Sequence, residues 1–153
     1  MSKVEQRLIA AGIALPQPVA PIANYVPFVR AGNLVHISGQ VSLDGSGGIT
    51  GTVGVDVDLE HAQRAARLCG INLLAQMKAA CDGDLDRVKR VVKLGGFVQA
   101  GPDFFDIPAV VNGCSDVMVE AFGDAGRHAR SAVGVYRLPR NFAVEVDAVV
   151  EIG

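Results

Sequence analysis

The sequence predicts an α+β fold, with a mixed sheet of about six strands, two long helices on one face and a short N-terminal helix. Three observations lead to this prediction. Short apolar extended segments occur in both halves of the chain. Two longer segments have apolar residues spaced three or four apart, and the final segment alternates strictly. The expected order is therefore strand, strand, long helix, strand, helix, strand, strand.

Composition agrees with a single domain over residues 1–153. The chain is 50% hydrophobic and 20% charged, which is typical of a folded core and not of a disordered chain. Its length allows a core without metal or disulfide crosslinks. Residues 1–15 are interpreted as an N-terminal helical extension, in which residues 3–11 form a short amphipathic helix that ends at Gly12.

The next segments are extended. Three prolines between residues 15 and 21 forbid a helix, and the extended chain continues through residues 24–29. Residues 33–39 are expected to form a strand. The glycine-rich residues 43–49 indicate a turn and not a phosphate loop, because they lack the required Lys and Ser or Thr pair.

Two helices flank a central strand. Asp58 is a favourable N-cap for the strongest helix, Leu59–Cys81. Residues 88–100 are rich in Val and indicate a strand, in which Gly95-Gly96 points to a bulge or a close backbone approach. The second helix is expected over residues 108–122, with Pro in its first turn.

The last two strands are expected at residues 131–137 and 143–152, with a turn at residues 138–141. In the final strand, apolar residues alternate onto one face and Glu145, Asp147 and Glu151 lie on the other. If the two strands pair as a hairpin, the polar face of the last strand meets the face of its neighbour that carries Arg130.

Arg130 and Glu145 are the candidate pair for chemistry. In that hairpin register Glu145 lies opposite Gly134, and Arg130 lies four residues along on the same face, about 13 Å away. The two groups could hold opposite ends of a small ligand. The guanidinium would bind a carboxylate, and the glutamate would hold a water or move a proton. The alternative interpretation is that both are ordinary surface charges.

Charge and residue counts argue against several other classes. A net charge of −2 and 5% aromatic residues disfavour nucleic-acid binding. Three cysteines without close spacing favour a reducing, cytoplasmic location over a disulfide framework. No apolar run approaches the about 20 residues of a membrane span. No histidine has a partner at metal-ligand spacing, and we expect no metal site.

The C-terminal third resembles a known family. The segments His128-Ala129-Arg130-Ser131-Ala132-Val133-Gly134-Val135, Leu138-Pro139 and Val144-Glu145-Val146 resemble the closing signature of the RidA (YjgF-type) proteins, also labelled endoribonuclease L-PSP. Ser38-Gly39-Gln40 resembles the family's early Ser-Gly-Gln strand end, and Tyr25 falls at the position of its N-terminal tyrosine. The resemblance covers nearly the whole chain and is to a longer-chain subgroup.

This resemblance implies a chorismate-mutase-like fold and a homotrimer with ligand sites in clefts between subunits. The implied activity is cofactor-free hydrolysis of reactive enamines and imines, such as 2-aminoacrylate, to 2-keto acids and ammonia. By position, Arg130 would clamp the substrate carboxylate and Glu145 would position the attacking water. The implied substrate-binding residues are Tyr25, which would close the pocket from a neighbouring subunit, and Ser38, Gly39, Asn112 and Ala132.

The sequence also departs from the family pattern. Ala132 stands where many members have Cys, Tyr25 is followed by Val26-Pro27, and the segment around Asn112 differs from the usual helix. The N-terminal helix could cover the cleft and alter substrate choice. Two alternatives to the deaminase therefore remain: a non-catalytic or regulatory trimer that binds small carboxylates, and, as the weakest, a ribonuclease.

Overall fold

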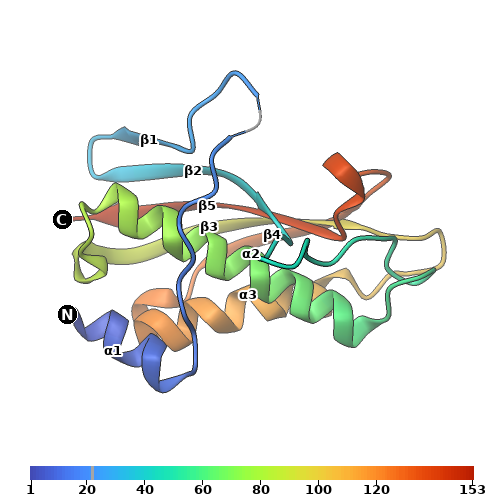
Figure 1. Ribbon diagram of the computed structural model, residues 1–153, viewed down its shortest axis with the longest axis horizontal. Helices are drawn as coiled ribbons and strands as arrows, with labels where there is room; N and C mark the ends of the chain where they lie inside the picture. The colour runs from blue at the N-terminus through green and yellow to red at the C-terminus, as the bar shows by residue number, and fades with distance from the viewer. Residues whose placement is uncertain (22) are drawn as a thin grey trace.

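A mixed five-stranded sheet with helices on one face forms the body of the molecule (Figure 1). The computed structural model describes residues 1–21 and 23–153. The sheet has the order β1-β2-β5-β3-β4. Its strands are β1 (Phe28–Ala31), β2 (Leu34–Val41), β3 (Val88–Gln99), β4 (Ala129–Val135) and β5 (Val144–Ile152). The helices are α1 (Lys3–Ala10), α2 (Leu59–Ala80) and α3 (Ile107–Phe122), with short 3₁₀ turns η1 (Leu85–Arg87), η2 (Gly123–Gly126) and η3 (Pro139–Asn141).

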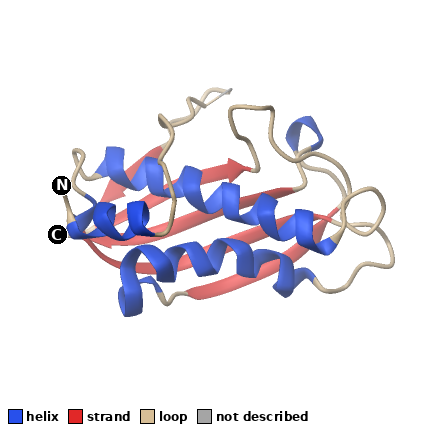
Figure 2. Cartoon of the chain, turned by 60° about the horizontal axis from the view of Figure 1, so that its bottom comes forward, coloured by secondary structure: helices blue, strands red, loops and turns tan. Residues whose placement is uncertain are grey.

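The predicted α+β class is confirmed, with five strands in place of about six. Residues 24–27 precede the sheet, and only Phe28–Ala31 join it as the short edge strand β1. Helices α2 and α3 lie side by side across one face, as Figure 2 shows. No helix described over residues 1–21 and 23–153 combines the length and apolarity needed to cross a membrane.

The predicted pairing of the last two strands is wrong. β4 pairs with β3 in parallel, and β5 pairs with β3 antiparallel, so β3 separates the two strands. The chain leaves β3, crosses through α3 and returns alongside β3 as β4, which is the helical crossover that a parallel pair requires. The turn at residues 138–141 therefore carries the chain past β3 to the far side, and Glu145 pairs with Phe97 instead of Gly134.

The core lies between the sheet and the two long helices. The alternation predicted for the last strand is confirmed, because Val144, Val146, Ala148, Val150 and Ile152 are all at most 2% exposed. The stripe predicted for α2 is buried against them, including Ala62, Ala66, Cys69, Leu73 and Met77. Glu145, Asp147 and Glu151 alternate with the buried residues and face the side of the sheet that α2 and α3 do not cover.

The helix boundaries follow their capping residues. The Asp58 carboxylate accepts a hydrogen bond from the His61 amide at 2.8 Å and begins α2. Ser2 and Glu5 form a reciprocal capping box at the start of α1. The amides of Lys3 and Val4 donate to the Asp86 carboxylate at 2.9 and 3.0 Å, which anchors α1 beside η1.

Glycines set the close approaches between layers. A Cβ at Gly113 would lie 2.9 Å from the backbone carbonyl carbon of Gln63, so α2 and α3 pack with their backbones in contact. A Cβ at Gly96 would meet Val111 of α3 at 2.7 Å. The close approach predicted at Gly95-Gly96 is confirmed, whereas the register shifts of β3 lie earlier, between Val88 and Lys93.

Candidate active site

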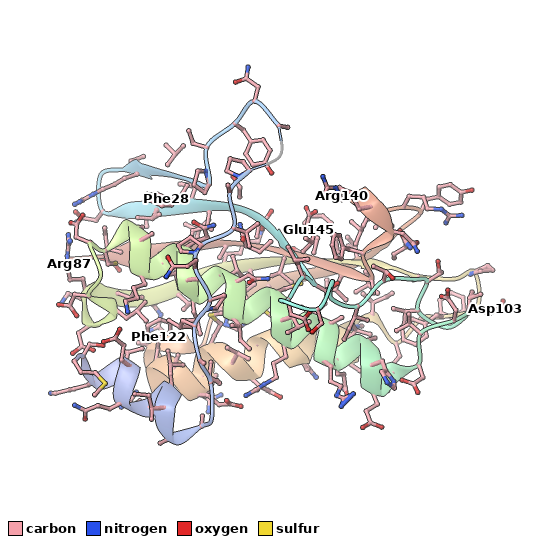
Figure 3. The ribbon with its side chains drawn as sticks, in the orientation of Figure 1. Phe28, Arg87, Asp103, Phe122, Arg140 and Glu145 are labelled. Carbon is pink, nitrogen blue, oxygen red and sulfur yellow. The ribbon has the colours of Figure 1, made fainter. Side chains whose placement is uncertain are left out.

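A cavity of about 110 Å³ opens beside Glu145, between β2, β5, η3 and the segment that precedes β1. Among the described residues, its wall is largely apolar and contains one carboxylate, Glu145, and one guanidinium, Arg140. Figure 3 shows Arg140 on the η3 turn, near Glu145 on β5. The other lining residues are Val19, Ala20, Pro21, Tyr25, Pro27, Gly39, Gln40, Val41, Leu43, Asn72, Pro139 and Phe142.

A β-bulge shapes the floor of this cavity. The register of β2 against β5 shifts between the pairs Ile37–Ala148 and Gln40–Val146, so Ser38 and Gly39 together oppose Asp147. Because Gly39 has no side chain, the Glu145 side chain lies across it; a Cβ there would be 3.0 Å from Glu145 Cγ. The Ser-Gly-Gln segment therefore acts through its backbone shape.

Ser38 holds the outer wall of the cavity. Its hydroxyl donates to the Val26 carbonyl at 2.8 Å, and its amide donates to the Pro27 carbonyl at 2.9 Å. These bonds fix the segment that carries Tyr25, which is 49% exposed and lines the cavity. Tyr25 and Glu145 thus share one cavity within a single chain.

The segment that follows the N-terminal extension, residues 16–21, reaches this cavity. Helix α1 itself packs against α3 and η1. Residues 15–21 then cross α2, and the Gln76 side-chain amide donates to the Val19 carbonyl at 2.9 Å. Val19, Ala20 and Pro21 line the cavity as a result. The proline-rich segment, and not the N-terminal helix, forms part of the wall.

Two neighbouring carboxylates occupy the uncovered face of β5. Burial raises the pKa of Glu145, and the negative charge of Asp147 raises it further. Burial also raises the pKa of Asp147, while the Gly95 amide and Lys93 act in the opposite direction. Glycines make room for both groups, because Asp147 lies over Gly95 as Glu145 lies over Gly39. Glu145 is therefore a half-buried base with a raised proton affinity.

Arg130 lies at the edge of the sheet and is held by α3. Its Nη1 donates to Asn112 Oδ1 at 2.8 Å and to Ser115 Oγ at 3.1 Å. Its Nη2 donates to the Pro108 carbonyl at 3.4 Å. The predicted site residues Asn112 and Arg130 are thus brought together. Ala132 lies two residues along β4 and packs against the core on the same side.

Arg130 and Glu145 do not face one another within one chain, contrary to the hairpin prediction. Arg130 pairs with Leu94, and Leu94 pairs with Ala148, so Arg130 lies two strands away from β5 and level with Ala148, three residues from Glu145. The separation of Arg130 and Glu145 is therefore about 10 Å across the strands and about 10 Å along them. Arg130 also points to the helix-covered face, whereas Glu145 points to the uncovered one. One ligand cannot contact both side chains of the same chain.

Sequence reasoning did not identify Arg140 or Gln99 as parts of the site. Arg140 and Asn141 have positive φ angles of 53° and 63° in the η3 turn. Gln99, which is fully buried, holds this turn: its Oε1 accepts from the Leu138 amide at 2.7 Å and its Nε2 donates to Asn141 Oδ1 at 2.7 Å. The sequence signal for Gln99 is a polar residue at the end of an apolar strand, and Pro139-Arg140 indicates no more than a turn.

Metal and thiol chemistry have no site in the residues described. Those residues contain no group of three His, Cys, Asp or Glu side chains that could hold a metal ion. All three cysteines are buried. Burial raises the pKa of the Cys114 thiol to about 12 and that of Cys69 well above its ordinary value, so neither is a thiolate at neutral pH.

Comparisons with known proteins agree with this architecture. The YjgF/chorismate mutase-like endoribonuclease family matches residues 5–151. Protein TCP17 of Trypanosoma cruzi is 48% identical over 98% of this chain and 94% of its own. A 2-iminobutanoate/2-iminopropanoate deaminase of Dermatophagoides farinae is 33% identical over 96% of this chain and 97% of its own. The crystal structure of Atu1372 from Agrobacterium tumefaciens superposes with a TM-score of 0.92 and 49% identity, covering 98% and 92% of the two chains.

Proposed function

The chain belongs to the YjgF/chorismate mutase-like family, and from this premise we propose that it hydrolyses small reactive enamines and imines to 2-keto acids and ammonia. The observation that carries the proposal is Glu145, a half-buried carboxylate with a raised pKa in a small cavity that also contains Tyr25 and Gly39. Relatives about one-third identical to the chain are named 2-iminobutanoate/2-iminopropanoate deaminase, in agreement with this chemistry.

The reaction requires one base and one anchor. Water adds to the imine carbon, its oxygen forms the new C–O bond, and the C=N electron pair moves to nitrogen. Glu145 takes the proton from this water and returns a proton to the nitrogen. The resulting carbinolamine then forms the carbonyl and releases ammonia. The sum is a hydrolysis, with no net oxidation or reduction, and an adjacent carboxylate would be held by a guanidinium.

The anchor and the base come from different copies of the chain in this proposal. Arg130 lies on the edge strand β4 and Glu145 on the opposite face, so a second copy must bring its Arg130 to the Glu145 cavity. The uncovered face of the sheet carries the apolar side chains needed for such an interface. Val29, Leu34 and Val133 are 54%, 37% and 46% exposed there. A homotrimer with one site per interface is the closed assembly that we propose.

Mixed oligomers test both the roles of Arg130 and Glu145 and the proposal that each site takes the two residues from different copies of the chain. Arg130→Ala and Glu145→Gln are each expected to abolish most turnover of 2-aminoacrylate or 2-iminobutanoate generated in situ. Loss of the charge-assisted clamp corresponds to about 1.5–3 kcal/mol. Co-expression of the two variants should restore about one-quarter of the wild-type sites, since random mixing pairs intact Arg130 with intact Glu145 at that frequency.

The outcomes separate the alternatives. Wild-type turnover by Arg130→Ala would overturn the role of the clamp. No recovery on mixing, with both single variants inactive and correctly assembled, would overturn the proposal that two copies share one site. A second candidate is a non-catalytic carboxylate-binding oligomer, favoured by the fact that Arg130 is held independently of Glu145. That candidate predicts unchanged 2-oxobutanoate binding by Glu145→Gln in calorimetry and no turnover by the wild type.

A further inference from the structure

A chain of hydrogen bonds connects the backbone at Gly126 to the guanidinium of Arg130. The Gly126 carbonyl contacts His128 Nδ1 at 2.6 Å. His128 Nε2 lies 2.9 Å from Ser115 Oγ, and Ser115 Oγ lies 3.1 Å from Arg130 Nη1. We propose that Ser115 and His128 are positioning residues that orient Arg130 for its carboxylate, an inference that rests on the proposed function of Arg130.

The hydrogen-bonding groups in this series determine where each proton lies. A backbone carbonyl only accepts, so His128 Nδ1 carries the hydrogen and donates it to Gly126. In the neutral ring, Nε2 is unprotonated and accepts from the Ser115 hydroxyl. That hydroxyl oxygen accepts in turn from Arg130, which only donates. Burial lowers the pKa of His128, and Arg130 lowers it as well although the Gly126 bond opposes them, which favours the neutral ring that this order requires.

The series of hydrogen bonds begins at Gly126, whose position is fixed by its neighbours. Gly126 ends the η2 turn directly against the backbone of α3, where a Cβ would lie 3.0 Å from the Val119 amide nitrogen. The Arg90 side chain also donates to the Arg127 carbonyl at 3.2 Å, which ties this turn to β3. The His128 ring is therefore fixed relative to α3, the helix that carries Ser115.

The hydrogen bonds from Arg130 to α3 determine which edge of its guanidinium remains available to bind a ligand. Asn112 and Ser115 take both hydrogens of Nη1, and the Pro108 carbonyl takes one hydrogen of Nη2. Within residues 1–21 and 23–153, the Nε–H and the second Nη2–H are left. These two donors are suited to a bidentate carboxylate. Without the Ser115 bond, one Nη1 hydrogen loses its acceptor and the side chain gains freedom to rotate.

Three variants test whether Ser115 and His128 position Arg130. Ser115→Ala removes the link between His128 and Arg130 while keeping the helix. His128→Leu removes the acceptor, and His128→Gln supplies an amide oxygen that can accept from Ser115. We expect Ser115→Ala and His128→Leu to raise KM for 2-iminobutanoate, and the Kd for 2-oxobutanoate, by roughly fivefold with kcat nearly unchanged, since one hydrogen bond is lost. His128→Gln should recover most of the affinity.

The control is Asp116→Asn, which changes the exposed neighbour of Ser115 on the same helix and should leave KM unchanged. If Arg130→Ala loses affinity but Ser115→Ala keeps the wild-type KM, the positioning role is overturned and the function of Arg130 stands. If Arg130→Ala itself behaves as wild type, the proposed function fails instead. Should His128→Leu not fold, Ser115→Ala and His128→Gln still decide the result.

Discussion

The side chain of Glu145 occupies the space directly above the Cα of Gly39. A Cβ at position 39 would lie 2.8 Å from the carboxyl carbon of Glu145 and 3.0 Å from its Cγ. This contact exists because the bulge at Ser38-Gly39 turns both residues toward Asp147 and leaves Gly39 beneath the carboxylate. The glycine thus determines where the proposed base lies in the cavity.

Gly39→Ala should therefore reduce turnover without unfolding the protein. The obstructing atoms belong to the flexible end of Glu145, which can rotate away at little cost in stability. Displacement of a catalytic group by about 1 Å can lower kcat on the order of 100-fold. Imine hydrolysis and thermal unfolding would be measured together. Gly45→Ala, where a Cβ meets nothing within 4 Å, is the control, and wild-type kcat in Gly39→Ala would contradict the prediction.

Asp147→Asn should shift the acid limb of the kcat–pH profile to lower pH. Burial raises the pKa of Glu145 most, and the charge of Asp147 adds to this. Because the carboxylate form acts as the base, activity rises with pH through that raised pKa. Removal of the neighbouring charge makes ionisation easier and extends activity to more acidic solutions. Glu151→Gln, on the same face of β5 and exposed, should leave the limb in place; an unmoved limb in Asp147→Asn would exclude the coupling.

The sequence predicted the elements better than their partners. Periodicity placed α2, α3 and β5 to within two residues, because burial on one face determines where each apolar side chain must lie. It also placed Glu145 opposite the core. The pairing of β4 could not be derived this way, because a hairpin and a crossover give the same alternation within each strand. The faces of Arg130 and Glu145 were consequently misjudged.

The site residues also differ in how far the sequence predicts them. A family resemblance identifies Arg130, Asn112, Glu145 and Gly39 by their positions in the sequence, but it does not give their arrangement in space. Ser115, His128 and Gln99 form side-chain hydrogen bonds to residues 13 to 48 positions away. Such bonds leave no periodic signal in a single sequence. Their roles emerge only when the fold brings the two ends together.

Gly113→Ala should destabilise the protein even though Ala is the better helix former. Helix propensity favours Ala by about 1 kcal/mol. The added Cβ, however, would meet the carbonyl group of Gln63 in the rigid backbone of α2, and overpacking of this kind costs about 1–3 kcal/mol. Urea denaturation should show a net loss. Gly70→Ala, which meets side-chain atoms of Cys114 and Val117 at the longer distances of 3.2–3.4 Å, should lose less, and an equal or smaller loss for Gly113→Ala would refute the backbone contact.

Gln99→Leu should lower both stability and turnover. The buried Gln99 amide joins two loops, because it donates to the Gly51 carbonyl at 3.0 Å and to Asn141 while accepting from the Leu138 amide. An apolar side chain leaves these partners unsatisfied, at a cost of about 1–3 kcal/mol. The η3 turn also presents Pro139 and Arg140 to the cavity, so its release should disturb the site. Arg140→Ala is the matched variant, since it removes the cation and keeps the Gln99 bonds. Equal denaturation midpoints for Gln99→Leu and Arg140→Ala would show that Gln99 does not hold the turn.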